Sequence, residues 1–270
     1  SGALLMTGVR SIATTAVAQS EAQVLATLAQ TGVRATLTDL SRTGGDLASA
    51  VGTLCAQPDE TTLAQAREAW RAAYLSWRRA EPFLFGPVKA LGLERRIGVW
   101  PPNIQVLEGA VTSSDLAPLL RTADTRGYAA TEFLLFVPSD ARTATADRRC
   151  SHLIDASREI AELTARAPAV WEADYERRFL AAGDGEPFLT PGDALSLPIA
   201  SALNVTERML RDRIGPASGI FEGEPDLQWL DGRHSDSARA GLGASLEGLR
   251  LMLVEGETDI ASLVATRDGV

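Results

Sequence analysis

The chain has 270 residues, a formal net charge of −9 and 45% hydrophobic residues, which is the composition of an ordinary globular protein. A general nucleic-acid binder needs a basic stripe that displaces counterions, but here the arginines are dispersed and Lys89 is the only lysine. No run approaches the roughly 18 apolar residues that a membrane-spanning helix requires. We therefore expect no nucleic-acid partner and no transmembrane segment in this chain.

Apolar residues recur at helical spacing along most of the chain. The first helical stretch, roughly 20–55, is expected to be interrupted by the sequence TGG at 43–45. The second, Glu60–Glu81, carries one apolar stripe made of Leu63, Ala66, Trp70, Ala73, Tyr74 and Trp77. Three more stretches follow at 152–180, 192–214 and 235–254. Since no segment alternates in the manner of a strand, the pattern predicts an all-α protein of two packed, up-and-down helical bundles.

Two segments, 82–102 and 215–233, are rich in proline and glycine, so we expect them to be mostly irregular. Irregular segments between rigid helices commonly display binding groups. The sequence PSDARTATAD at 138–147 is typical of a linker. It divides the chain into an expected N-terminal bundle, 1–145, and a C-terminal bundle, 146–270.

The absence of several common motifs excludes some classes of catalytic site. The chain has none of the patterns HExxH, GxGxxG, GxxxxGK[ST] or GxSxG, and His152 and His234 are its only histidines, so a three-histidine zinc site cannot be built. Cys55 and Cys150 are the only cysteines. They form either one long-range disulfide, in an oxidising compartment, or two small buried thiols.

The sequence GYAATEFLLF at 127–136 places Glu132 directly before four apolar residues. At about 100° per residue, those four side chains cover every side of a helix, which must then be buried nearly all round. A buried carboxylate needs a cation, hydrogen-bond donors or a proton. Glu132 either faces solvent at a helix end, pairs with an arginine such as Arg78 or Arg79, or lies in a cleft where it holds a metal or a polar ligand.

Two other groups of residues are candidates for binding. Arg78 and Glu81 end the aromatic helix beside an irregular segment, although Trp70, Tyr74 and Trp77 themselves read as core. In WLDGRHSDS at 229–237, His234 is a candidate ligand near an expected helix start, and Ser235 or Asp236 is expected to cap the first turn.

Four blocks of the chain, taken in order, resemble the imelysin-like family of peptidase-like proteins from bacterial envelopes. They are AWRAAYLSWRRAEPFLFGPV (69–88), VWPPN (99–103), RGYAATEFLLF (126–136) and RHSDSARAGLGASLEGLRLML (233–253). The resemblance covers roughly residues 20–255. It implies two helical-bundle domains, secretion to the periplasm or outer surface through a removed signal peptide, often as a lipoprotein, and an association with iron acquisition.

The family signature GxHxxE maps onto Gly127, Ala129 and Glu132, so alanine stands in the histidine position. Asn103 of VWPPN also stands near a place where an acidic residue is usual. A metal-assisted hydrolase needs several protein ligands and an open position for water, and the local motif supplies one carboxylate. The remaining ligands of a metal site would have to come from elsewhere in the fold, and the candidates are Glu81, Glu108, His234 and Asp236. Oxygen-rich ligands would suit iron or another hard divalent cation better than zinc.

The resemblance and the missing histidine favour an envelope binding protein linked to iron uptake, without protease activity. The expected partner is a small ligand, a metal ion or another envelope protein. The residues assigned to binding are Gly127, Tyr128, Ala129, Glu132, Arg78, Glu81, Trp100, His234 and Ser235, with Glu132 also the one candidate metal ligand. Two alternatives stay open: a metallopeptidase with rearranged ligands, and an interaction module whose site has decayed.

Overall fold

The computed structural model describes residues 21–113, 115, 117–146, 148–221, 223–254 and 259–268. Every regular element within these ranges is helical, and the only β-type pairing is an isolated bridge between Gly185 and Phe188. The predicted all-α class is therefore confirmed. None of the helices in the described part is long and apolar enough to cross a bilayer.

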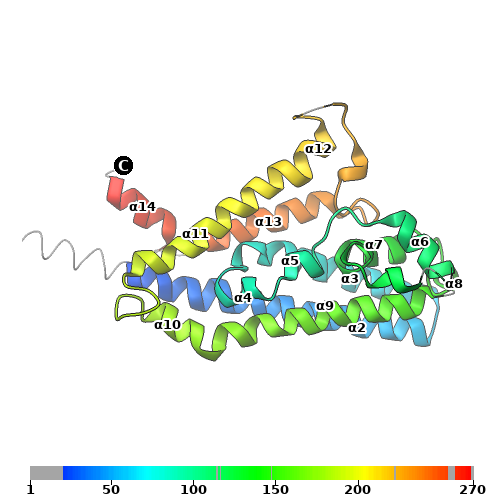
Figure 1. Cartoon of the computed structure of the whole chain (residues 1–270), viewed down its shortest axis with the longest axis horizontal. Helices are drawn as coiled ribbons and strands as arrows, with labels where there is room; N and C mark the ends of the chain where they lie inside the picture. Colours follow the sequence, from blue (N-terminus) through cyan, green and yellow to red (C-terminus); the bar gives the residue numbers. More distant parts are fainter. Residues whose placement is uncertain are drawn as a thin grey trace, which may run out of the picture.

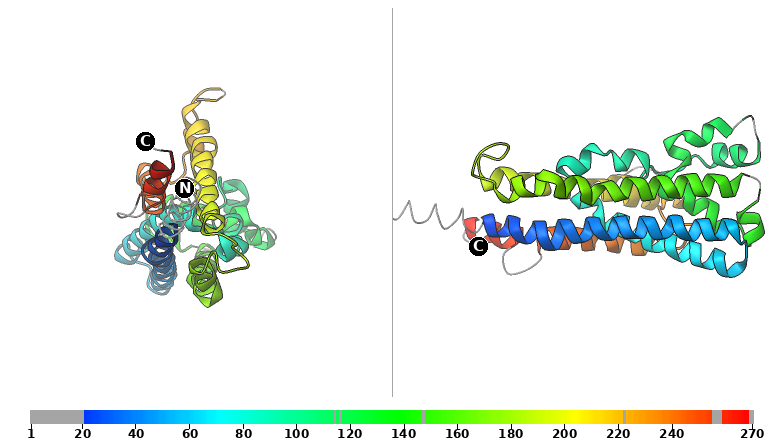
Figure 2. Two further views of the ribbon diagram at one scale, coloured as in Figure 1. Left: turned by 90° about the vertical axis from the view of Figure 1, so that its left-hand side faces the viewer. Right: turned by 90° about the horizontal axis from the view of Figure 1, so that it is seen from below.

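Three long helices form the body of an elongated bundle, which is clearest in Figure 1 and in the right-hand view of Figure 2. They are α2 (Ala35–Ala56), α3 (Glu60–Ala80) and α9 (Arg149–Val170), with α2 packed along both of the others. A π-helical segment, η1 (Leu28–Arg34), precedes α2. Another, η5 (Trp171–Tyr175), joins α9 to α10 (Glu176–Leu180).

The helix α2 runs without a break through residues 43–45, so the expected interruption at TGG is wrong. The reason is packing rather than local propensity. Gly44 is buried against α9, where a side-chain carbon on Gly44 would collide with the hydroxyl of Thr164. A glycine costs roughly 1 kcal/mol inside a helix, but here it permits the close approach of two helices.

Cys55, at the end of α2, and Cys150, at the start of α9, form a disulfide across 95 residues, with their Cα atoms 5.6 Å apart. The disulfide alternative of the sequence analysis is the one observed. Both the disulfide and the α2–α9 packing join segments from the two sides of residue 146. The division of the chain into an N-terminal bundle, 1–145, and a C-terminal bundle, 146–270, therefore stays a prediction.

A second layer is formed by the C-terminal helices. α13 (Ala238–Leu253) packs along α3, and α11 (Pro191–Arg208) continues through η6 (Met209–Ile214) into α12 (Gly215–Ser218). Figure 1 shows α11 and α13 diverging toward α12, while α14 (Ile260–Asp268) lies near their other end.

The segment 82–102, expected to be mostly irregular, contains several short helices. Pro82 and Pro87 account for part of this difference, because each stands in the first turn of a short helix, where its missing N–H costs nothing. The short elements of the middle of the chain are η2 (Glu81–Phe83), α4 (Gly86–Ala90), α5 (Leu93–Arg96), α6 (Ile104–Thr112), η3 (Ala117–Arg121), η4 (Ala123–Thr125), α7 (Gly127–Phe136) and α8 (Ala141–Ala144). Segment 215–233 is open by comparison, with α12 and η7 (Leu227–Trp229) as its helical turns.

Candidate functional site

Glu132 is completely buried within α7, whose residues 127–135 are buried on all sides as predicted. Its Oε1 accepts two hydrogen bonds from Ser235, one from the backbone N–H at 2.8 Å and one from the hydroxyl at 2.7 Å. Its Oε2 is buried and has no hydrogen-bond partner among the described residues. Burial raises the pKa of the Glu132 carboxyl, and the two bonds from Ser235 oppose that rise. The solvent-facing alternative is thereby excluded.

The start of α7 is fixed from two directions. Gly127 has a left-handed backbone (φ +72°) and lies so close to Ile97 that a side-chain carbon would collide with the Ile97 backbone. The next residue, Tyr128, donates its N–H to the Ile97 carbonyl at 3.0 Å. From the other side, the indole N–H of Trp70 donates to the Tyr128 carbonyl at 3.0 Å. These contacts set the rotation of α7 that directs Glu132 toward Ser235.

Neither expected arginine reaches Glu132. Arg78 forms ion pairs with Glu81, at 2.9 Å, and with Asp231, while Arg79 lies 3.5 Å from Asp39. Glu81 follows Arg78 by three residues and is therefore its natural helical neighbour. The alternative in which Arg78 or Arg79 pairs with Glu132 is not the one observed, because nearer carboxylates pair with both guanidinium groups.

Arg78, Glu81, Arg213 and Asp231 form a buried charge network, and each is at most 8% exposed. Glu81 Oε1 accepts from both Arg78 and Arg213. Burial alone would raise the pKa of Glu81, but the two guanidinium groups outweigh it and hold that pKa below its ordinary value. Arg213 and Asp231 were not predicted, because no local pattern links them to Glu81 and Arg78, which lie more than 130 residues away along the chain.

A cavity of about 590 Å³ lies beside this region and is here called the tryptophan cleft. Its walls include Trp100, Asn103, Asp124, Asp226, Gln228, Trp229, Arg233 and His234. The Trp100 indole N–H donates to the Trp229 carbonyl at 3.2 Å, which ties the two sides of the cleft together. Burial and the nearby Arg233 lower the pKa of His234, so its ring is neutral at pH 7.

Of the predicted binding residues, Trp100 and His234 line the tryptophan cleft. Glu132 and Ser235 adjoin it, because Ser235 follows His234 and because the His234 ring packs edge-on against Phe133 at 5.5 Å. Gly127, Tyr128 and Ala129 are buried in the core. Arg78 borders another cavity, and Glu81 lies in the charge network.

The predicted helix cap is also wrong. α13 begins at Ala238, after Ser237, and the Ser235 hydroxyl is directed to Glu132 instead of to the first turn. Asp236 is exposed and has a left-handed backbone (φ 58°). Sequence reasoning placed a cap here because serine and aspartate favour that position, and it had no means of seeing a carboxylate 103 residues away.

The described residues contain no group of three or more His, Cys, Asp or Glu that could hold a metal ion. Glu108 and Asp236 are exposed, and Ala129 brings no polar atom to Glu132. His152, the other histidine, contacts the Thr125 carbonyl through Nε2 at 2.7 Å and is buried. The donor set therefore does not fit a bare metal ion.

The fold and this site define a helical-bundle protein with a buried carboxylate beside a polar cleft. The imelysin family model matches residues 33–269, so the chain belongs to the imelysin family. A curated relative, iron-regulated protein A from Synechococcus elongatus, is 34% identical over 95 residues. That match spans 35% of this chain and 26% of the relative, about a quarter of the relative's length.

Two solved structures share the fold. A protein from Parabacteroides distasonis, described as an iron-regulated protein A precursor, is 19% identical with a TM-score of 0.74, and the match covers 92% of this chain and 79% of that one. An imelysin-like protein from Psychrobacter arcticum is 18% identical with a TM-score of 0.68, and the match covers 92% and 76%.

Proposed function

We propose that this imelysin-family protein binds a polar ligand connected with iron uptake in the tryptophan cleft and does not cleave peptides. One observation carries the proposal: the tryptophan cleft, of about 590 Å³, adjoins the family-motif glutamate through His234 and Ser235. Its volume is within the range of ordinary small-molecule sites.

The walls of the tryptophan cleft favour a ligand with both charged and flat parts. Arg233 offers a guanidinium fork to an anionic group, and Asp124 and Asp226 offer acceptors. Trp100 and Trp229 supply aromatic surface that is partly exposed. Since no cluster of metal ligands exists in the described part of the chain, the iron species that fits is a complex carrying its own ligands rather than a bare ion.

Titration of the purified protein with ferric citrate, haem, ferric chloride and zinc chloride tests the proposal by calorimetry and tryptophan fluorescence. We expect one of the two iron complexes to bind and to quench the emission of Trp229. Trp229→Ala and Arg233→Gln should each weaken that binding at least tenfold. Arg239→Gln, which changes an exposed arginine at the start of α13, is the matched control and should bind as wild type.

The absence of heat and of quenching with all four additives would overturn the proposal. So would equal binding by the wild type and Trp229→Ala, because the ligand would then lie outside the tryptophan cleft. Binding of ferric chloride or zinc alone with the higher affinity would contradict the preference for a complex.

The peptidase alternative requires an ion held by several protein ligands and an activated water. With Ala129 in the motif, we expect no cleavage of unfolded casein when zinc or iron is supplied. Cleavage that a chelator and Glu132→Gln both abolish would establish the alternative.

The other alternative is an interaction module whose metal site has been lost, and restoring the motif histidine at position 129 tests it. Ala129→His places an imidazole three residues before Glu132, on the same face of α7. Metal affinity that appears in Ala129→His and is absent from the parent would identify Glu132 as the remaining part of a metal site.

We also propose an envelope location. The Cys55–Cys150 disulfide is typical of oxidising compartments, and the Parabacteroides relative is described as a precursor. Cell fractionation with an antibody against the chain, in its native host, tests this: recovery in the cytoplasmic fraction with free thiols would contradict it. Lipid attachment belongs to the same proposal and is read by mass spectrometry of the mature protein.

A further inference from the structure

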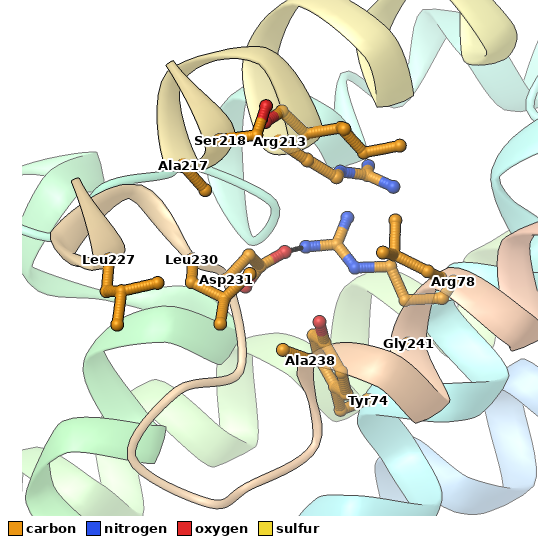
Figure 3. Close-up of a pocket in the computed structure, with 12 residues that line it drawn as sticks. Tyr74, Arg78, Arg213, Ala217, Ser218, Leu227, Leu230, Asp231, Ala238 and Gly241 are labelled. Atoms are coloured by element: carbon orange, nitrogen blue, oxygen red, sulfur yellow. Dashed lines mark hydrogen bonds and ion pairs between the residues drawn. The ribbon is translucent and has the colours of Figure 1, made fainter. Parts of the chain in front are cut away.

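A second cavity, of about 240 Å³, lies on the other side of segment 226–234 and is here called the arginine cavity. Residues of α3, of the η6–α12 turn, of that segment and of α13 enclose it (Figure 3). Segment 226–234 forms a wall of both cavities, because Leu227, Leu230 and Asp231 line the arginine cavity while Gln228 and Trp229 line the tryptophan cleft.

The arginine cavity combines apolar walls with a charged floor. The apolar walls are formed by Ile214, Ala217, Leu227, Leu230, Ala238 and Leu242. Arg78, Arg213 and Asp231, each more than nine-tenths buried, supply the charge. Figure 3 shows the guanidinium groups of Arg78 and Arg213 pointing toward one another, with Asp231 to one side and the Tyr74 hydroxyl below.

The two arginines differ in how well their charges are neutralised. Arg78 pairs with two carboxylates, those of Glu81 and Asp231. Among the described residues, Arg213 pairs only with Oε1 of Glu81, which it shares with Arg78, and with the neutral hydroxyl of Ser245 at 3.2 Å. A guanidinium has five N–H donors in a fork that fits a carboxylate, so Arg213 can bind a further anionic group.

Burial lowers the pKa of Arg213, and the attraction of Glu81 only partly opposes this effect. An additional carboxylate beside Arg213 would therefore relieve a real electrostatic cost. Glu81 and Asp231 already balance the formal charges of Arg78 and Arg213, so a ligand with more than one negative charge would be repelled by these carboxylates.

We propose that the arginine cavity binds a small monocarboxylate with an apolar body. The carboxylate meets Arg213, and the body packs against Leu227, Leu230 and Leu242. A dry cavity of about 150 Å³ holds benzene, so about 240 Å³ accommodates one ring or a short alkyl chain with its carboxylate. This site is separate from the tryptophan cleft and does not depend on the function proposed there.

Calorimetry with four probes of similar size tests separately whether the carboxylate and the apolar body of the ligand are needed for binding. Benzoate and hexanoate should bind at least tenfold more tightly than benzyl alcohol, and benzylamine should not bind. In methyl-labelled protein, both carboxylates should shift the NMR signals of Ile214, Leu227, Leu230 and Leu242. Equal affinity for benzyl alcohol and benzoate would overturn the role of Arg213, and shifts confined to residues outside the arginine cavity would overturn the site.

Three variants then locate the binding. Ala238→Leu fills the cavity without touching the charge network and should abolish benzoate binding. Arg213→Gln should weaken it at least tenfold, whereas Arg211→Gln, an exposed arginine two residues earlier on η6, is the matched control and should leave it unchanged. Unaltered binding in Ala238→Leu would refute the proposal even if Arg213→Gln proved too unstable to measure.

Discussion

At the scale of single residues, the raised pKa of Glu132 predicts how the stability of the protein depends on pH. This pKa is raised by burial from the ordinary value of 4.5, so the folded protein keeps the proton to a higher pH than the unfolded chain. Between those two pKa values the folded state binds more protons, and the free energy of unfolding therefore falls as the pH rises. The ionised form is the one that burial penalises.

Glu132→Gln should remove this dependence, because an amide of the same shape still accepts from Ser235 and carries no charge. We expect the variant's melting temperature, relative to wild type, to rise with pH above the pKa of the unfolded carboxyl and to level off once the pH passes the raised pKa of the folded state. Ser235→Ala should behave in the opposite way, since it removes a donor to the ionised carboxylate, and should cost about 1–3 kcal/mol at pH 8. Scanning calorimetry across pH measures both, and parallel curves for Glu132→Gln and wild type would contradict the assignment.

The partners of Glu132 show where sequence reasoning stops. Burial of Glu132 follows from the four apolar residues after it, because they leave no solvent-facing side of the helix. Its actual partner, Ser235, is supplied by a loop 103 residues away, and local rules assigned that serine to a helix cap. Spacing along the chain does not encode which distant segments meet, so Asp231, Arg213 and Trp229 also escaped prediction.

At the scale of elements, the long helices follow their patterns closely. The predicted stripe of Glu60–Glu81 is buried at all six positions in α3, and the last predicted stretch, 235–254, matches α13 at 238–253. Periodicity succeeds there because one face of each helix meets the core over several turns. The use of glycine as a helix-breaking signal failed at residues 43–45, where Gly44 is explained by the neighbouring helix α9.

Glycines also set the distance between α3 and α13, which is the basis of an element-scale prediction. A side-chain carbon on Gly248 would collide with the Arg79 carbonyl, while one on Gly243 meets nothing within 4 Å. Gly248→Ala should destabilise the protein by about 1–3 kcal/mol, because the helices must move apart. Gly243→Ala, on the same helix, should stabilise it by about 0.5–1 kcal/mol. Urea denaturation compares them, and equal effects would contradict the packing argument.

The buried charge network joins α3 to η6 and to the loop before α13, so it contributes to the docking of these elements. Glu81→Gln leaves two buried guanidinium groups without their shared carboxylate and should cost about 3–5 kcal/mol at pH 7. Glu94→Gln is a matched comparison: it removes a partly exposed partner of Arg208, 2.9 Å away, and should cost about 1 kcal/mol or less. A loss for Glu81→Gln no larger than that for Glu94→Gln would show that the network does not hold these elements.

At the scale of the whole molecule, the Cys55–Cys150 disulfide closes the loop that contains α3, the short middle helices and the Glu132 segment. A covalent link across 95 residues restricts the unfolded chain far more than the folded one. In the folded protein α2 and α9 are also packed against one another by their own side chains. The disulfide should therefore act on stability and leave the arrangement of the helices unchanged.

The double variant Cys55→Ser/Cys150→Ser should lose about 3–5 kcal/mol of unfolding free energy, which for a chain of this size lowers the melting temperature by on the order of 10 °C. Its far-ultraviolet circular dichroism should match that of the wild type at 20 °C, because the helices pack without the link. Dithiothreitol should lower the melting temperature of the wild type to that of the variant and should not affect the variant itself. If thiol titration shows full reduction of the wild type and its melting temperature has not moved, the disulfide does not stabilise the protein by closing this loop.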